Sequence, residues 1–214
     1  MRLYSYFRSS AAYRVRTALA LKGLPYDYLA VHLLKDGGQQ LQPDFRRLSP
    51  DALVPVLEDD GHVLTQSLAI IEYLEETHPA PALLPATPPE RARVRALALN
   101  IACDIHPLNN LRVLKYLKSP LGIDQQERDE WYRHWVEGGL AALERMLAGS
   151  PYTGLCCHGD QPTVADLCLV PQVYNARRLK ANLEGMPTVV RIADHCAELP
   201  AFQAAHPDAQ PDAE

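Results

Sequence analysis

A proline-rich segment most constrains how this 214-residue sequence can fold. Residues 79–89 contain five prolines, which suit neither a helix interior nor a central strand, because proline fixes φ and lacks a backbone N–H. The residue patterns on its two sides also differ. We therefore predict a linker at 81–89 between a first domain at 1–80 and a second at 90–207, followed by a disordered tail at 208–214.

The first domain is predicted to mix strands and helices. A helix follows the break at Arg8-Ser9-Ser10 and stops at Lys22-Gly23-Leu24-Pro25. The pattern of apolar residues predicts further elements, namely strands at 3–7, 26–33, 53–57 and 62–65 and helices at 43–48 and 68–78. The order strand–helix–strand, then strand–strand–helix, is a thioredoxin-like arrangement without the Cys-x-x-Cys motif.

The second domain is predicted to be all-helical. Its helices are expected at 91–118, 124–147, 162–179 and 187–199. In the third of these, Asp166 is an acidic residue of the kind that catalysis uses. It follows Thr163 by three positions, as in a capping box, so we interpret it as a helix cap.

The start of the first helix is the first candidate site. Ser9 and Ser10 precede it, and the unpaired N–H groups of a first helical turn favour an anion. That anion is a phosphate, a carboxylate or a thiolate, and a hydroxyl at a helix N-terminus suits a thiolate. Gln66-Ser67 precedes the helix at 68–78 in the same way.

Composition excludes several classes of function. The net charge of −5 and the absence of basic runs argue against nucleic acid as a partner. No segment has the length of a membrane span or the layout of a signal peptide, so we expect a cytoplasmic protein with no membrane partner. The five cysteines fit no zinc pattern, and we expect no metal; Cys103 and Cys168 are interpreted as small core residues.

Several long motifs resemble those of cytosolic glutathione transferases. They are Tyr-Phe-Arg-Ser-Ser, Leu-Leu-Lys-Asp-Gly-Gly-Gln-Gln, Gln-Ser-Leu-Ala-Ile-Ile-Glu-Tyr-Leu-Glu-Glu and Ala-Asp-Leu-Cys-Leu-Val-Pro-Gln-Val. More narrowly, they resemble the zeta class, which includes maleylacetoacetate isomerases and is similar to bacterial maleylpyruvate isomerases. The resemblance extends to about Pro211. It implies a glutathione transferase fold, an α/β thioredoxin-like domain followed by an all-α domain, with glutathione as cofactor and a homodimer as the assembly.

The resemblance also implies a set of site residues. Ser9 would donate to the glutathione sulfur, assisted by Ser10, and Val54 would pair its backbone with the tripeptide. The remaining glutathione contacts would come from Gln40, Gln66, Ser67, Asp104, His106 and Asn110. Asp104 would meet the γ-glutamyl ammonium, either within one subunit or across the dimer. The catalytic and substrate-binding arginines would be Arg8, Arg112 and Arg178.

Some of these assignments have alternatives. Arg112 is equally read as a solvated or ion-paired helix residue, and for Arg177 that reading is favoured. His106 is interpreted as a structural or glutathione-contacting residue rather than a general base. The family's usual Ser-Ser-Cys is Ser9-Ser10-Ala11 here. Isomerisation by the thiolate of glutathione does not need that cysteine, although side activities that use a protein thiol would.

The expected function is glutathione-dependent cis–trans isomerisation of maleylacetoacetate, a small dicarboxylic keto acid, in tyrosine and phenylalanine catabolism. One alternative is maleylpyruvate isomerisation in gentisate degradation. Another is conjugation or dehalogenation of small α-halo acids, which would consume glutathione. A non-catalytic glutathione-binding protein is a further alternative, since a fold does not fix a function.

Overall fold

The structure is a computed structural model that describes residues 1–214. It divides into two compact units. The first, here called the N-terminal unit, comprises Met1–Leu83 together with Glu198–Glu214, and the second, here called the helical unit, comprises Leu84–Ala197. The expected fold class, a thioredoxin-like α/β region followed by a helical region, is confirmed.

The N-terminal unit contains one mixed sheet of four strands in the order β2-β1-β3-β4. The strands are β1 (Arg2–Ser5), β2 (Asp27–Ala30), β3 (Val56–Asp59) and β4 (His62–Thr65). β1 runs parallel to β2 and antiparallel to β3, and β4 pairs antiparallel with β3 through the predicted Asp-Gly hairpin. The first three strands are offset from or shorter than their predicted ranges.

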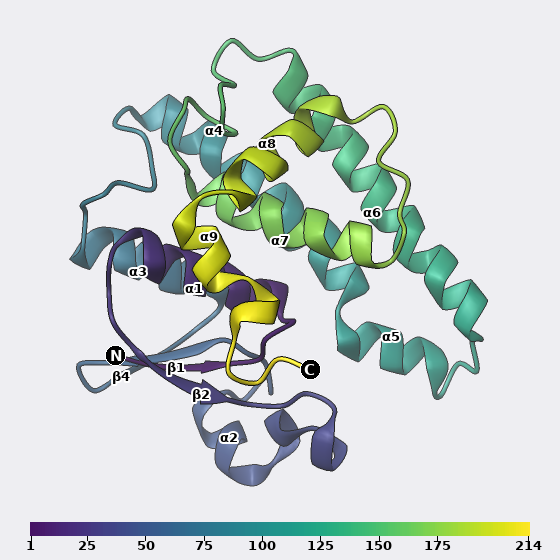
Figure 1. The fold of residues 1–214 in the computed structure, drawn as a ribbon. Helices are drawn as coiled ribbons and strands as arrows, with labels where there is room; N and C mark the ends of the chain where they lie inside the picture. The colour runs from purple at the N-terminus through teal and green to yellow at the C-terminus, as the bar shows by residue number, and fades with distance from the viewer. The chain divides into compact units, whose positions relative to one another are not determined.

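Helices cover both faces of this sheet. α1 (Ser10–Leu21) packs against α3 (Ser67–Thr77), and both lie on the opposite side of the sheet from α2 (Pro43–Leu48), as Figure 1 shows. On the α2 side, Phe45 meets Tyr4 edge to face with ring centroids 6.0 Å apart. The core there also includes Val54 and Val56. Helices thus cover both faces of the sheet around its central strands β1 and β3, and the β1–α1 junction lies at the end of one of these central strands.

A buried ion pair closes the N-terminal unit at its boundary. Lys22 Nζ lies 2.8 Å from Glu75 Oε2 and also donates to the carbonyls of His78 and Pro81 at 2.6 and 2.9 Å. Glu75 in turn accepts the N–H of Leu83 at 3.0 Å. The first residues of the proline-rich segment are thus held to the N-terminal unit, which extends to Leu83 rather than to residue 80.

The C-terminal segment differs most from the expectation. Residues 198–207 were expected in the helical domain and 208–214 in a disordered tail, whereas both belong to the N-terminal unit. α9 (Pro200–Ala205) packs on α1, as Figure 1 shows, and a 3₁₀ turn, η5 (Pro207–Ala209), follows it. Tyr13 donates to the Phe202 carbonyl at 3.2 Å, and Arg16 to the Ala205 carbonyl at 3.0 Å. These contacts are formed with residues far away in the sequence.

The helical unit is all-α. Its elements are α4 (Pro88–Leu99), η3 (Asn100–Ile105), η4 (His106–Asn109), α5 (Leu111–Lys118), α6 (Gln125–Ala148), α7 (Val164–Arg178) and α8 (Pro187–Ala197). Within the unit, α7 packs on α4 and α8, and α6 packs on α8. The predicted bounds of the later helices agree closely.

The single helix predicted at 91–118 is wrong, because the chain turns between α4 and α5. Pro107 lies in the turn, and Asn110 begins α5 by accepting the N–H of Arg112 at 3.1 Å. Trp131 of α6 donates to the Leu108 carbonyl at 2.8 Å and holds the turn in place. Ile105 approaches Gly139 so closely that a Cβ at Gly139 would lie 2.4 Å from Ile105 Cγ1.

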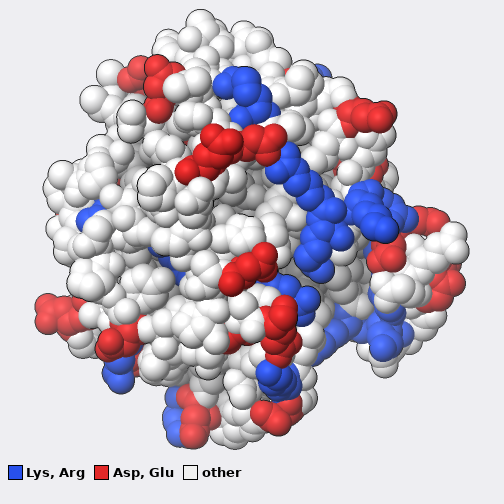
Figure 2. Space-filling view, in the orientation of Figure 1, with Lys and Arg blue, Asp and Glu red and all other residues white.

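The surface mixes both signs of charge. On the face in Figure 2, Lys and Arg side chains are interspersed with Asp and Glu, and uncharged residues cover most of the area. No helix combines the length and apolar composition needed to span a membrane. Cys103, expected in the core, is exposed, whereas the other four cysteines are buried.

Candidate functional site

Ser9 lies at the N-cap of α1, as expected from the sequence. Its Oγ accepts the N–H of Ala12 at 3.2 Å, and its own N–H donates to the Tyr6 carbonyl at 2.9 Å. Because Oγ acts as acceptor in the capping bond, the hydroxyl proton is available to donate to an anion. The first-turn N–H groups add a partial positive charge at the same place. Ser10 is the first residue of α1 and is buried.

Arg8 is half-buried beside the aromatic residues that precede it. Its Nη2 donates to the Tyr6 hydroxyl at 3.1 Å, and its guanidinium lies 5.1 Å from the centroid of the Phe7 ring. These contacts hold the Arg8 side chain one residue before Ser9 and leave other guanidinium N–H groups for an anionic ligand.

The start of α3 forms a second part of the site. Gln66, at the N-cap of α3, has φ of 67°, a conformation that non-glycine residues adopt rarely. Ser67, the first helical residue, is buried, and its Oγ accepts a hydrogen bond from Arg14 Nη1 at 3.3 Å. Arg14 is 2% exposed, and its Nε and Nη2 have no hydrogen-bond partner in the chain. A buried cation beside a helix N-terminus favours an anion there.

Arg14 was not identified from the sequence. It lies four residues after Ser10 on α1 and reads as an ordinary solvated residue of an amphipathic helix. In the structure α1 is buried on all sides from Ala12 to Leu19, so Arg14 is buried with its neighbours. The signal in the sequence was the position of Arg14 next to the apolar Val15.

Gln40 and Val54 lie on two other segments of the N-terminal unit. Gln40 is buried, its Nε2 lies 3.4 Å from the Leu33 carbonyl, and its Oε1 has no partner. The side chain packs so tightly on Gly38 that a Cβ there would lie 2.8 Å from Gln40 Nε2. Val54 precedes a cis peptide bond to Pro55. The pairing of β3 with β1 begins at Val56, so the backbone N–H and carbonyl of Val54 lie outside that ladder.

The remaining predicted residues belong to the helical unit. Asp104 and Arg112 are exposed, and His106 starts η4. Asn110 serves as the N-cap of α5. Arg178, near the end of α7, is exposed and hydrogen-bonds the hydroxyl of Tyr132. Burial raises the pKa of Tyr132 to about 12, an effect that Arg178 partly offsets, so this phenol stays protonated at neutral pH.

Arg177 has the structural role that the sequence favoured. Its Nη1 lies 2.7 Å from Asp194 Oδ1, an exposed ion pair between α7 and α8.

Seven of the predicted residues thus lie in the N-terminal unit and five in the helical unit. The seven come from the β1–α1 junction, the segment after β2, the approach to β3 and the start of α3, and they are Arg8, Ser9, Ser10, Gln40, Val54, Gln66 and Ser67. Within that unit, the bond from Arg14 to Ser67 links α1 to the start of α3. The five are Asp104, His106, Asn110, Arg112 and Arg178.

A buried cluster at the start of α7 contains three side chains of the kinds that bind metals. The nearest ligand atoms of Cys156, Asp166 and Cys196 lie within 4.8 Å of one another. The Asp166 carboxylate already accepts the Cys157 N–H at 2.8 Å and both the N–H and hydroxyl of Thr163, at 2.8 and 2.9 Å. A hydrogen bond with Cys156 and burial raise the pKa of Cys196. The Asp166 carboxylate therefore forms a capping box with Thr163, as the spacing of the two residues predicted, and the Cys196 thiol stays protonated.

Comparison with known proteins places this geometry in a class. Residues 3–82 match the family described as "Glutathione S-transferase, N-terminal domain". Together with the four-stranded sheet, the capped α1 and the following helices, this match defines a glutathione transferase.

Full-length relatives narrow the class. The chain is 52% identical to the "Probable maleylacetoacetate isomerase" of Vibrio cholerae, over 99% of this chain and 97% of that protein. A solved maleyl pyruvate isomerase, titled a bacterial glutathione S-transferase in Zeta class, superposes with a TM-score of 0.97 at 48% identity, with both chains fully covered. The maleylacetoacetate isomerase of Anaeromyxobacter dehalogenans, solved with bound dicarboxyethyl glutathione and citrate, has a TM-score of 0.85 at 50% identity, covering 100% of this chain and 97% of that one. The chain belongs to the zeta-class glutathione transferase family of maleylacetoacetate and maleylpyruvate isomerases.

Proposed function

We propose that this protein is a glutathione-dependent maleylacetoacetate isomerase, which converts maleylacetoacetate to fumarylacetoacetate in tyrosine and phenylalanine catabolism. The observation that carries the proposal is Ser9, whose hydroxyl caps α1 as an acceptor and retains its proton for an anion. The full-length relatives of that name support the choice of reaction.

The residues of the N-terminal unit fit glutathione. Gln40 offers a buried carboxamide oxygen with no partner in the chain, which suits an N–H donor of the tripeptide. Val54 has a peptide outside the β1–β3 ladder, which suits strand-like pairing with the cysteinyl backbone. Ser67 and Gln66, with the buried Arg14 guanidinium behind them, suit the γ-glutamyl carboxylate.

Ser9 is proposed to hold the sulfur in its ionised form. A hydroxyl donor and the positive end of α1 both favour a thiolate over a thiol and so lower the pKa of the bound thiol. Ser10 assists from the same turn. When bound, glutathione supplies a thiolate that adds to the cis double bond and departs after the bond has rotated, so that none is consumed.

The arginines are proposed to act on the substrate. Arg8, Arg112 and Arg178 carry guanidinium groups that can bind carboxylates in bidentate fashion and stabilise negative charge developing on the carbonyl oxygen. All three retain exposed or half-exposed side chains. Arg177, paired with Asp194, is not assigned a role in catalysis.

The helical unit is proposed to complete the glutathione contacts through Asp104, His106 and Asn110. We propose that the protein acts as a homodimer in which Asp104, whose carboxylate is exposed in the single chain, meets the γ-glutamyl ammonium of its own or of the partner's glutathione. Five free cysteines suit the reducing cytoplasm as its location.

Maleylpyruvate isomerisation is the second candidate. Solved structures of the two enzymes superpose on this chain equally well, with TM-scores of 0.97 for a maleyl pyruvate isomerase and 0.96 for a maleylacetoacetate isomerase. Ala11, in place of the family's usual cysteine, agrees with a maleylpyruvate isomerase. The two substrates share the reacting carbons and differ in the acyl tail.

The test is an isomerase assay with maleylacetoacetate and maleylpyruvate in parallel, each with and without glutathione. Turnover that requires glutathione but does not consume it supports isomerisation, and the ratio of the two rates identifies the substrate. Stoichiometric consumption of glutathione with an α-halo acid would support conjugation or dehalogenation instead. Binding of glutathione without turnover of any of these compounds would indicate a binding protein.

A matched pair of cap variants tests Ser9. Ser9→Ala should lower kcat/KM roughly a hundredfold, as loss of one donor to a developing anion does. Asp124→Ala removes the N-cap of α6, where Asp124 accepts the Glu127 N–H at 2.9 Å, and should leave turnover unchanged. Each variant loses about 1 kcal/mol of stability from its cap. If both variants retained full turnover, the assignment of Ser9 would be wrong.

A further inference from the structure

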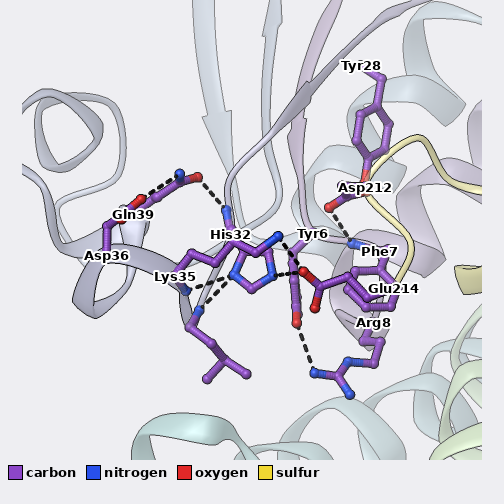
Figure 3. A network of polar contacts seen from close by, with 11 residues as sticks. Tyr6, Phe7, Arg8, Tyr28, His32, Lys35, Asp36, Gln39, Asp212 and Glu214 are labelled. Carbon is purple, nitrogen blue, oxygen red and sulfur yellow. Dashed lines mark hydrogen bonds and ion pairs between the residues drawn. The ribbon is translucent and has the colours of Figure 1, made fainter.

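Asp212, in the C-terminal segment whose composition predicts disorder, binds the peptide just before the candidate site. Its Oδ2 accepts the N–H of Phe7 at 3.1 Å, as Figure 3 shows. Phe7 is two residues before Ser9, and the Ser9 N–H returns to the Tyr6 carbonyl at 2.9 Å. Asp212 therefore contacts the turn that orients the Ser9 hydroxyl.

Arg16 holds the same residue from its other side. Its Nη2 donates to the Phe7 carbonyl at 2.9 Å, and its Nη1 lies 3.3 Å from the Tyr6 carbonyl. Arg16 is fully buried, and burial lowers its pKa. The negative charge of Asp212 acts in the opposite direction and favours the guanidinium cation. The carbonyl and the N–H of Phe7 are thus fixed by two side chains of opposite charge.

Tyr28 fixes Asp212 itself. The Tyr28 hydroxyl donates to Asp212 Oδ1 at 2.6 Å. Burial, and then this hydrogen bond, raise the pKa of Tyr28, so its phenol remains a donor at neutral pH. With one oxygen bound to Tyr28 on β2 and the other to Phe7, the carboxylate has a single well-defined position.

The end of the same segment has a second attachment. Glu214 forms an ion pair with Lys35, and its Oε1 lies 3.3 Å from His32 Nε2 (Figure 3). His32 is buried, its ring meets Tyr6 edge to face, and its N–H donates to Gln39 Oε1 at 2.8 Å. Gln39 directly precedes Gln40, so both attachments of the segment lie next to proposed glutathione contacts.

From these contacts we infer that Asp212 is a positioning residue, which acts through the Phe7 peptide to aim the Ser9 hydroxyl at the bound sulfur. The C-terminal segment is then part of the machinery that ionises glutathione, although it does not touch the ligand. The inference rests on the proposed role of Ser9. It assigns Asp212 an effect on thiol ionisation in addition to any effect on stability.

The test compares Asp212→Ala and Asp212→Asn with Asp208→Ala. Asp208 lies in the same segment with a 77% exposed side chain beside His206 and serves as the matched control. The first readout is amide hydrogen exchange at Phe7 in the protein without glutathione. The second is the ultraviolet absorbance of the bound thiolate, followed against pH with saturating glutathione. The third is kcat and KM for glutathione.

Asp212→Ala should abolish protection of the Phe7 N–H and raise the pKa of the bound thiol by about one unit, because small displacements of a positioned donor weaken it strongly. At neutral pH, kcat should fall roughly tenfold with a smaller change in KM, by the same argument. Asp212→Asn retains an acceptor for the Phe7 N–H, so its loss of Phe7 protection, its rise in thiol pKa and its fall in kcat should all be smaller than those of Asp212→Ala. Asp208→Ala should match the unsubstituted protein.

An unchanged thiol pKa in Asp212→Ala, with thermal stability alone reduced, would overturn the inference and leave Asp212 a structural residue. The proposed function fails separately, if the unsubstituted protein binds glutathione without forming a thiolate near neutral pH. Loss of Phe7 protection in Asp208→Ala to the same extent would also refute a specific role for Asp212.

Discussion

Replacement of Asp166 distinguishes a helix cap from a catalytic acid, the two interpretations that the sequence allowed. The carboxylate is fully buried and accepts three hydrogen bonds from nitrogen and oxygen donors, namely the Cys157 N–H and the N–H and hydroxyl of Thr163. A fourth, weaker contact comes from the Cys196 thiol, whose Sγ lies 3.8 Å from Asp166 Oδ1. Asp166→Ala leaves the three nitrogen and oxygen donors, and the weaker thiol donor, without this acceptor. Thr163 and Cys157 are themselves buried, so water does not readily replace it.

The expected loss follows from those donors. Each buried donor left unpaired costs about 1–3 kcal/mol, and the Thr163 hydroxyl can rotate toward another acceptor, so we expect a loss of about 3–5 kcal/mol. Asp160, an exposed residue of the same loop, accepts one hydrogen bond, from the Leu155 N–H at 2.9 Å. Asp160→Ala should therefore cost only about 0.5–1.5 kcal/mol.

The assay is urea unfolding at fixed protein concentration, followed by tryptophan fluorescence. Trp131 and Trp135, the two tryptophans of the chain, both lie on α6 and report on the helical unit that contains Asp166. Turnover is measured on the same samples at low temperature. Equal stability of the Asp166 and Asp160 variants would refute the capping argument. A stable Asp166→Ala protein without turnover would make Asp166 a catalytic residue after all.

Three further outcomes are expected. Lys22→Met removes the cation that pairs with the buried Glu75 carboxylate and should lower the free energy of unfolding by about 3–5 kcal/mol. The double variant with Glu75→Gln should regain part of that free energy, and urea titration measures both variants. At most one thiol, that of the exposed Cys103, should react with a thiol reagent before unfolding, because the other four are buried; faster labelling of more thiols would contradict this. The hydrogen bond from Lys35 lowers the pKa of Glu214 below its ordinary 4.5, so this attachment is complete above pH 4.5 and is lost as the pH falls through the lowered value. Limited proteolysis of the C-terminal segment against pH should show the loss, and Glu214→Gln should remove this pH dependence.

Local patterns were enough to predict most of the fold. The Asp59-Asp60-Gly61 turn placed the β3–β4 hairpin, the Thr163–Asp166 spacing placed the cap of α7, and both are present. The expected bounds of α6 also agree, because its N-cap at Asp124 is a local signal. These elements depend on residues a few positions apart, which a sequence displays directly.

Long-range contacts account for what the sequence did not show. The end of the chain is polar and contains Pro207 and Pro211, a composition typical of disorder, yet Asp212 binds Phe7 and Tyr28 from the opposite end. Arg14 likewise reads as a solvated residue, and only the packing of α1 against α3 shows that it is buried beside Ser67. Pro107 is a local signal for a break after α4. The apolar periodicity of 91–118 favoured one continuous helix, and the prediction followed the periodicity.

Chain order has a consequence for synthesis on the ribosome. Residues Glu198–Glu214 complete the N-terminal unit, but all of Leu84–Ala197 is translated between its two parts. At about 5–20 residues per second, the first part waits on the order of ten seconds before α9 and Asp212 become available. During that interval the guanidinium of Arg16 lacks the Ala205 carbonyl, and the turn before Ser9 lacks its carboxylate. The turn before Ser9 therefore gains its carboxylate contact only after the whole helical unit has been translated.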